Sequence, residues 1–140
     1  MLKLSKTSKI LFSLLVSATL EATSLEDFYL QVHQQSLQKD YVTFRGRSLL
    51  SHEAYIEILK ESEKERLQGS LVMIRGRIER FIYLNETGGI ALSSDQNANL
   101  RFDIRYYETL KDIGIGGGFF AICVLPRYDK CLLLGYKAFD

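Results

Sequence analysis

The sequence contains few of the residues that mark disordered, metal-binding or catalytic chains. It has a single proline, Pro126, and no segment of low complexity, so intrinsic disorder is not expected. Its two histidines, His33 and His52, and two cysteines, Cys123 and Cys131, lack the spacing of a zinc site. A G-x-S-x-G motif is also missing. We therefore expect a folded protein that binds no metal or cofactor and is not an enzyme.

The chain also lacks an excess of charge of either sign. Its 18 Lys and Arg residues are balanced by 17 Asp and Glu residues. Residues 1–22 contain three of the basic residues and one of the acidic ones, so without them the formal charge is −1. A near-neutral protein has no general field that attracts nucleic acid or anionic lipid. Any such binding would need a local patch. The length of 140 residues suits one domain.

The N-terminus has the three parts of a secretory signal peptide. Three lysines and no acidic residue in Met1–Lys9 are followed by the apolar run Ile10–Leu20. Small residues then offer cleavage after Ala18 or after Ala22. A transmembrane helix needs about 20 apolar residues, roughly twice this run. The sequence predicts a bacterial signal peptide over residues 1–22, a periplasmic or secreted location, and a mature chain without a transmembrane segment.

Residues 23–68 show helical patterning. Ser24 is the expected N-cap of a first helix. A connection follows, with a short extended piece at Val42–Phe44. Ser51 is the expected N-cap of a second, amphipathic helix that reaches about Leu67.

Residues 69–140 change to the two-residue period of β-strands. Strands are expected at Leu71–Leu84, Ile90–Ser93, Leu100–Arg105, Phe119–Leu125 and Cys131–Phe139, with a short helix at Tyr107–Ile113. Gly76 marks a place where the long first strand can bend or bulge. This order predicts an α+β, mainly β fold: a five-stranded OB-type barrel preceded by one or two N-terminal helices. The alternative is a half-open five-stranded sheet packed on the two helices.

Three short motifs carry a resemblance to known families. They are the apolar-x-Gly-x-Ile pattern in Val72–Ile78, the turn at Thr87–Ile90, and Leu110–Gly114 before a strand. Over residues 50–139 the chain resembles the bacterial tRNA-anti-like OB-fold family, and more loosely the bacterial periplasmic OB-fold family. The resemblance implies an OB fold, but it does not imply RNA binding by an exported protein.

The outer faces of the first and third barrel strands carry the predicted binding residues. They are Arg75, Arg77, Arg101 and Arg105, with Tyr106 and Tyr107 close by. OB-folds use this face to bind single strands through basic and aromatic side chains. Glu79 and Asp103 lie in the same rows, and such mixed signs favour cross-strand ion pairs. We therefore expect a non-catalytic module that binds a protein or cell-envelope partner, with single-stranded nucleic acid as the alternative ligand.

The two cysteines, Cys123 and Cys131, flank a predicted hairpin. A three-residue loop, Pro126–Tyr128, would place them opposite each other, at the lower end of disulfide geometry. A four-residue loop, Pro126–Asp129, would pair Cys123 with Leu132 and leave two separate thiols. An oxidising compartment favours the disulfide.

Overall fold

The computed structural model describes residues 22–60, 67–85 and 87–136. The N-terminal part consists of α2 (Ala22–Leu37), β1 (Val42–Phe44), β2 (Arg47–Ser51) and α3 (His52–Leu59). The remainder consists of β3 (Leu71–Asn85), β4 (Gly89–Ser94), β5 (Asn99–Phe102), the 3-10 helix η2 (Ile104–Tyr106), α4 (Tyr107–Ile113), β6 (Gly118–Val124) and β7 (Asp129–Tyr136).

Five of the strands close into a barrel. Their order is β3-β4-β5-β7-β6, and pairing of β3 with β6 completes the circle. β5 and β7 are parallel, whereas the other neighbours in the barrel are antiparallel. A helix, α4, connects the third barrel strand to the fourth. This is the OB topology, so the predicted barrel preceded by helices is confirmed, and the half-open sheet is wrong because β3 and β6 join.

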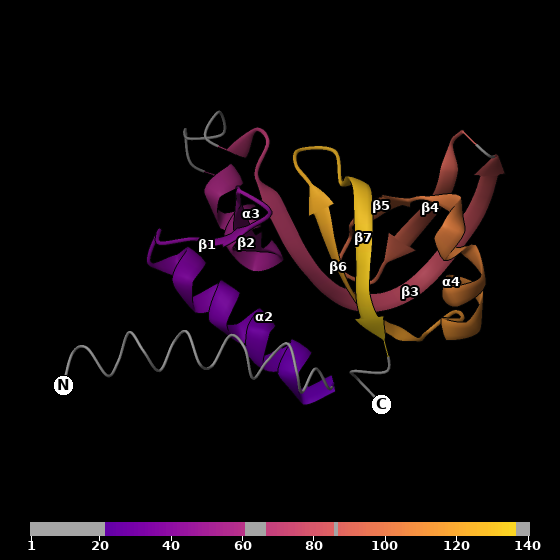
Figure 1. Ribbon diagram of the computed structural model, residues 1–140, viewed down its shortest axis with the longest axis horizontal. Coiled ribbons are helices and arrows are strands. Elements are labelled where there is room, and N and C mark those ends of the chain that lie inside the picture. Colours follow the sequence, from indigo (N-terminus) through magenta and orange to yellow (C-terminus); the bar gives the residue numbers. More distant parts are fainter. Residues whose placement is uncertain (1–21, 61–66, 86, 137–140) are drawn as a thin grey trace.

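One long, curved strand, β3, serves two sides of the barrel (Figure 1). Its first half pairs with β6 from Leu71 to Arg77, and its second half pairs with β4 from Ile78 to Asn85. The ladder to β4 is irregular between Ile78 and Arg80, just beyond the glycine predicted to bulge. Gly76 instead permits close approach, since a Cβ there would lie 2.9 Å from the Asp95 Oδ1 atom.

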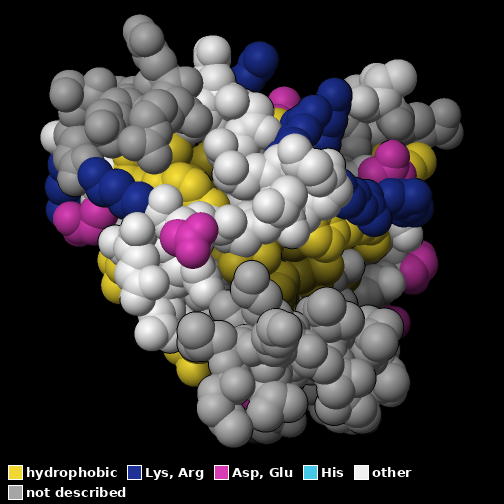
Figure 2. All heavy atoms as spheres, turned by 60° about the vertical axis from the view of Figure 1, so that its left-hand side comes forward, with side chains coloured by type: hydrophobic (Ala, Val, Ile, Leu, Met, Phe, Trp, Pro, Cys, Tyr) yellow, Lys and Arg dark blue, Asp and Glu magenta, His cyan; other side chains and the backbone are white. Residues whose placement is uncertain are grey.

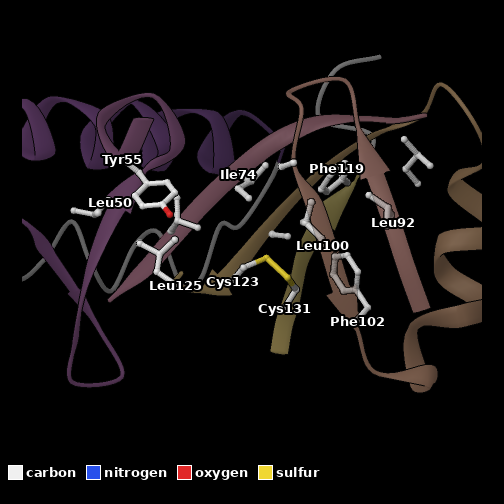
Figure 3. Packing of buried hydrophobic residues seen from close by; sticks show 14 of the residues in the cluster. Leu50, Tyr55, Ile74, Leu92, Leu100, Phe102, Phe119, Cys123, Leu125 and Cys131 are labelled. Atoms are coloured by element: carbon white, nitrogen blue, oxygen red, sulfur yellow. A yellow bond between two sulfur atoms is a disulfide. The ribbon is translucent and has the colours of Figure 1, made fainter. Parts of the chain in front are cut away.

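Two apolar cores flank the barrel wall. The first fills the barrel, and Figure 3 shows Leu92, Leu100, Phe102 and Phe119 within it. Leu110 of α4 is fully buried against this core at one end of the barrel. The second core lies outside the wall, where Leu25, Tyr29 and Val32 of α2 pack on Met73, Phe120 and Ile122. The spacing of the three α2 residues gives that helix a single apolar stripe facing the sheet.

The elements of the N-terminal part match those predicted from the sequence in some places and differ from them in others. The extended piece at Val42–Phe44 and the N-cap at Ser51 are confirmed, and the Ser51 side chain accepts a hydrogen bond from the Ala54 N–H. The helix predicted to start at Ser24 already begins at Ala22, so Ser24 lies within it.

The second predicted helix is shorter than expected, because α3 ends at Leu59. Its predicted continuation falls largely on residues 61–66, which lie outside the described residues. Strand β2 was not predicted at all. It extends the sheet by pairing in parallel with the start of β3. The signal peptide predicted over residues 1–22 lies almost entirely outside the described residues. Within the described ranges, no helix has the length and apolarity needed to cross a lipid bilayer.

Candidate binding face

The second half of β3, together with β4 and β5, presents a set of side chains that point away from the barrel. Cross-strand pairing aligns Ile82, Ala91 and Arg101 in one row, and Arg80, Ser93 and Asn99 in the next. Residues directly opposite each other project on the same side of a sheet. The alternate residues of β4 and β5 are buried in the barrel core, so both rows face outward. We call these six residues the outer face.

The outer face is lower along its centre than at its sides. The middle strand contributes the short side chains of Ala91 and Ser93, while β3 and β5 contribute longer ones. A hollow of about 460 Å³ lies at one end of β4, and a second of about 170 Å³ lies at the other end, beside Gly88 and Gly89. Helices α2 and α3 lie at the opposite end of the curved β3 (Figure 1). This arrangement suits an extended ligand lying along β4.

Arg75 lies away from the outer face, although the sequence grouped it with the binding residues. Its guanidinium forms an ion pair with Glu26 of α2 and lies 4.5 Å from the centre of the Tyr29 ring. These contacts hold α2 against β3. A substitution of Arg75 is therefore expected to loosen the packing of α2 on β3 rather than to weaken the binding of a ligand.

The other predicted binding residues are spread over several elements. The Arg77 guanidinium donates to the Gly116 carbonyl at 2.9 Å, and Arg101 donates to the Gly88 carbonyl at 3.1 Å. Arg105 lies over the Tyr106 ring, whose edge packs on Phe102; Tyr107 packs edge-on against Phe81 and Tyr83. Of the six predicted residues, only Arg101 belongs to the outer face.

The expected cross-strand ion pairs of Glu79 and Asp103 do not form. Asp103 caps η2 by accepting a hydrogen bond from the Arg105 N–H, and Glu79 has no ion-pair partner among the described residues. Glu79 instead lines the larger hollow.

The β6–β7 hairpin beside the outer face is fastened to α3 by Tyr128. Its hydroxyl lies 3.1 Å from the His52 Nε2 atom, and the Tyr55 ring packs edge-on against it. The Tyr128 carbonyl also accepts a hydrogen bond from the Arg101 N–H. Desolvation by burial lowers the pKa of His52 and raises that of Tyr128 to about 12. Both groups are therefore neutral at neutral pH, and they fix the hairpin relative to α3.

A serine, a histidine and a carboxylate meet between α2 and α3. The His33 Nδ1 atom lies 2.8 Å from the Ser51 Oγ atom and 3.9 Å from the Glu53 Oε2 atom, while the Tyr29 hydroxyl donates to Glu53. Ser51 is completely buried, and its oxygen already caps α3. This cluster therefore holds the two helices together and offers no accessible nucleophile.

A disulfide joins Cys123 and Cys131 within the barrel core, with Leu100 and Phe102 nearby (Figure 3). The pairs Ile122–Leu132 and Ala121–Leu133 have the register predicted for the three-residue loop, whereas Val124 at the turn pairs with Asp129, one residue out of that register. The shift between these pairs places an extra β7 residue opposite Cys123. Lys130 and Cys131 both lie opposite Cys123, and the disulfide uses the one that continues the Ile122–Leu132 register.

No cluster of three or more His, Cys, Asp and Glu side chains that could hold a metal occurs in the described part of the chain. Two polar side chains at the β4–β5 connection have structural partners instead. Asp95 accepts a hydrogen bond from the Arg77 N–H, and the Asn99 Oδ1 atom accepts one from Ser93.

Apolar side chains also gather on the opposite side of the molecule. Figure 2 views the molecule from the helical side and shows a band of them with charged side chains at its margins. Leu30 and Leu37 of α2 are about half exposed, and Phe28, Val42 and Phe44 are partly buried beside the second core.

Comparison with known proteins gives no family for this chain: no protein-family model, no curated protein and no solved structure matches it. The residues of the outer face must therefore carry the functional interpretation.

Proposed function

We propose that the protein is an exported, non-catalytic OB-type binding module, related to tRNA-anti-like domains, that recognises a protein or cell-envelope partner through its outer face. The observation that carries this proposal is the outer face itself. Its centre is formed by Ala91 and Ser93, its sides are formed by longer side chains, and a hollow lies at each end. OB-folds bind ligands on this part of the barrel.

The chemistry of the outer face favours such a partner over single-stranded nucleic acid. Aromatic stacking and a basic groove provide the main attraction for single strands. None of the six outer-face residues is aromatic, and Tyr106 and Tyr107 pack against other rings. Arg80 and Arg101 are its basic residues, and Glu79 and Asp103 line the adjoining hollows. An oligonucleotide would find neither a stacking platform nor a uniformly positive surface.

The proposal is tested by filling the centre of the outer face. The full chain and its Ala91→Arg variant are used to capture partners from an envelope extract. Thr43→Arg, on an exposed position of β1, is the matched control. A partner that binds the unaltered protein and the Thr43 variant, but not the Ala91 variant, is expected. If every captured component binds the Ala91 variant equally well, the proposed face is wrong.

A further inference from the structure

The larger hollow at the end of β4, which we call the polar hollow, is lined by polar residues alone in the part of the chain that the structure describes. They are Glu79, Arg80, Ser93, Ser94, Asn97 and Asn99. Its volume of about 460 Å³ lies within the range of small-ligand sites, roughly 300–1,000 Å³. Ligand sites are usually lined mainly by apolar side chains, so this lining selects an unusual kind of ligand.

A β-bulge brings two charged residues into the polar hollow. Consecutive side chains of a regular strand point to opposite faces, so Glu79 and Arg80 would normally be separated by the sheet. The register shift between Ile78 and Arg80 breaks this alternation, and both residues line the hollow. Bulges that redirect a side chain in this way are frequent beside functional sites.

Several groups in the polar hollow are not engaged by the protein itself. The side chains of Glu79, Arg80 and Asn97 have no hydrogen-bond or ion-pair partner among the described residues. Ser93 donates to the Asn99 Oδ1 atom at 3.1 Å, which orients that amide and leaves its NH₂ group to donate. A carboxylate, a guanidinium and two amides thus supply both acceptors and donors over a short distance.

This inventory matches a neutral ligand rich in hydroxyl groups. Glu79 and Arg80 cancel in charge, so the hollow has no net attraction for phosphate or another polyanion. Among the described residues, none that lines it is aromatic and could stack on a nucleobase, and none is apolar and could anchor an apolar side chain of a peptide. A hydroxyl both donates and accepts, so a ligand with several neighbouring hydroxyls satisfies the carboxylate, the guanidinium and the amides together.

We infer that the polar hollow binds an uncharged sugar unit of an oligosaccharide, whose chain continues along β4 past Ala91. This inference rests on the function proposed above and names the ligand class for one end of the same face. Ile82, which is half exposed in the neighbouring row, would contact the C–H groups of the next sugar ring.

The test is a titration of the ¹⁵N-labelled full chain with uncharged tetrasaccharides, namely cellotetraose, chitotetraose and maltotetraose, followed by NMR. We expect at least one of them to shift the amide signals of Ser93, Ser94, Asn97 and Asn99. Glu79→Gln removes a charged acceptor and should weaken binding about tenfold or more. Asn97→Gly should also weaken it, and glycine suits the positive φ of 58° at this position.

Two matched controls lie outside the lining of the polar hollow. Glu108→Gln changes an exposed carboxylate on α4, and Arg47→Gln changes an exposed arginine on β2; neither should alter sugar binding. The inference is wrong if no tetrasaccharide shifts these amides at millimolar concentration, or if binding is unchanged by both Glu79→Gln and Asn97→Gly.

The proposed function and the sugar inference can fail independently of each other. One outcome is that a captured partner is lost with Ala91→Arg but retained with Glu79→Gln, while no sugar shifts the spectrum. In that case the outer face is the binding site, as proposed, and the sugar inference is overturned. The sugar inference is also overturned if an extended peptide, and no sugar, shifts the amides of the polar hollow.

Discussion

Reduction of the Cys123–Cys131 disulfide should destabilise the barrel by a predictable amount. The bond joins residues eight apart, so it closes a short loop in the unfolded chain. The chain-entropy relation then gives about 2.5 kcal/mol of stabilisation at room temperature. For a protein of this size, that corresponds to a fall in melting temperature of about 10 °C. Both cysteines are buried, with exposed fractions of 0% and 5%, so reduction leaves the sulfur atoms in the core and isolates the effect of the cross-link.

The measurement is thermal unfolding of the full chain followed by circular dichroism, with and without reductant, with free thiols counted under denaturing conditions. The oxidised protein should show no free thiols, and the reduced protein should show two. The Cys123→Ala/Cys131→Ala variant should be less stable than the reduced protein, since it also loses the buried sulfur atoms. Two free thiols in protein isolated from the periplasm, or equal melting temperatures despite complete reduction, would refute the reasoning.

Three further predictions concern pH, backbone and processing. Burial lowers the pKa of His52 and raises that of Tyr128 to about 12. The unfolded chain therefore gains a proton at His52 more readily, and the free energy of unfolding should fall as pH drops below 6.5 and level off below the folded-state pKa. It should also fall as pH rises from 10 towards 12, where Tyr128 ionises more readily in the unfolded chain. Gly89→Ala should lower stability by about 2 kcal/mol or more in urea denaturation, because φ is 71° and the added Cβ would lie 2.2 Å from a backbone oxygen of β5. Expressed in a bacterium, the protein should give a shortened periplasmic species that begins near Thr19 or Thr23, as measured by intact mass.

Each of these predictions has a result that would contradict it. A His52→Gln variant with the same loss of stability between pH 7 and pH 5 (roughly the range in which histidine titrates) would show that another group is responsible. A fully stable Gly89→Ala protein would mean that β4 and β5 are not so closely apposed. A cytoplasmic product that retains Met1 would exclude the signal peptide.

Local patterning was enough to predict much of the fold. The alternation in Leu71–Leu84 and the signals for a short helix at Tyr107–Ile113 correspond closely to β3 and α4. Ser51 caps α3 as expected, because a cap requires only the few residues that follow it. The resulting order of strands and helix restricts the choice to a few topologies, of which the OB barrel was one.

The candidate site was largely beyond the reach of the sequence. Arg75 was grouped with the other arginines by strand alternation, but α2 covers it, and the position of a helix depends on distant packing. Glu79 was assigned to an ion pair, and Arg80 was overlooked, because a bulge arises between two strands and leaves no local signal. The contrast between the short side chains of β4 and the longer ones of its neighbours was the one available signal for the outer face.

The sequence by itself determined most of the segments that form strands and helices, although not β2, and that the two cysteines flank a hairpin, because periodicity, capping and turns act over a few residues. The tertiary structure alone decided that β3 closes the barrel with β6, that β2 joins in parallel, and that the β6–β7 register beyond the turn places Cys131 opposite Cys123. These features depend on pairing between segments far apart in the chain or on the register of the partner strand. The polar hollow has the same origin, since its lining comes from three strands and a turn that only the closed barrel brings together.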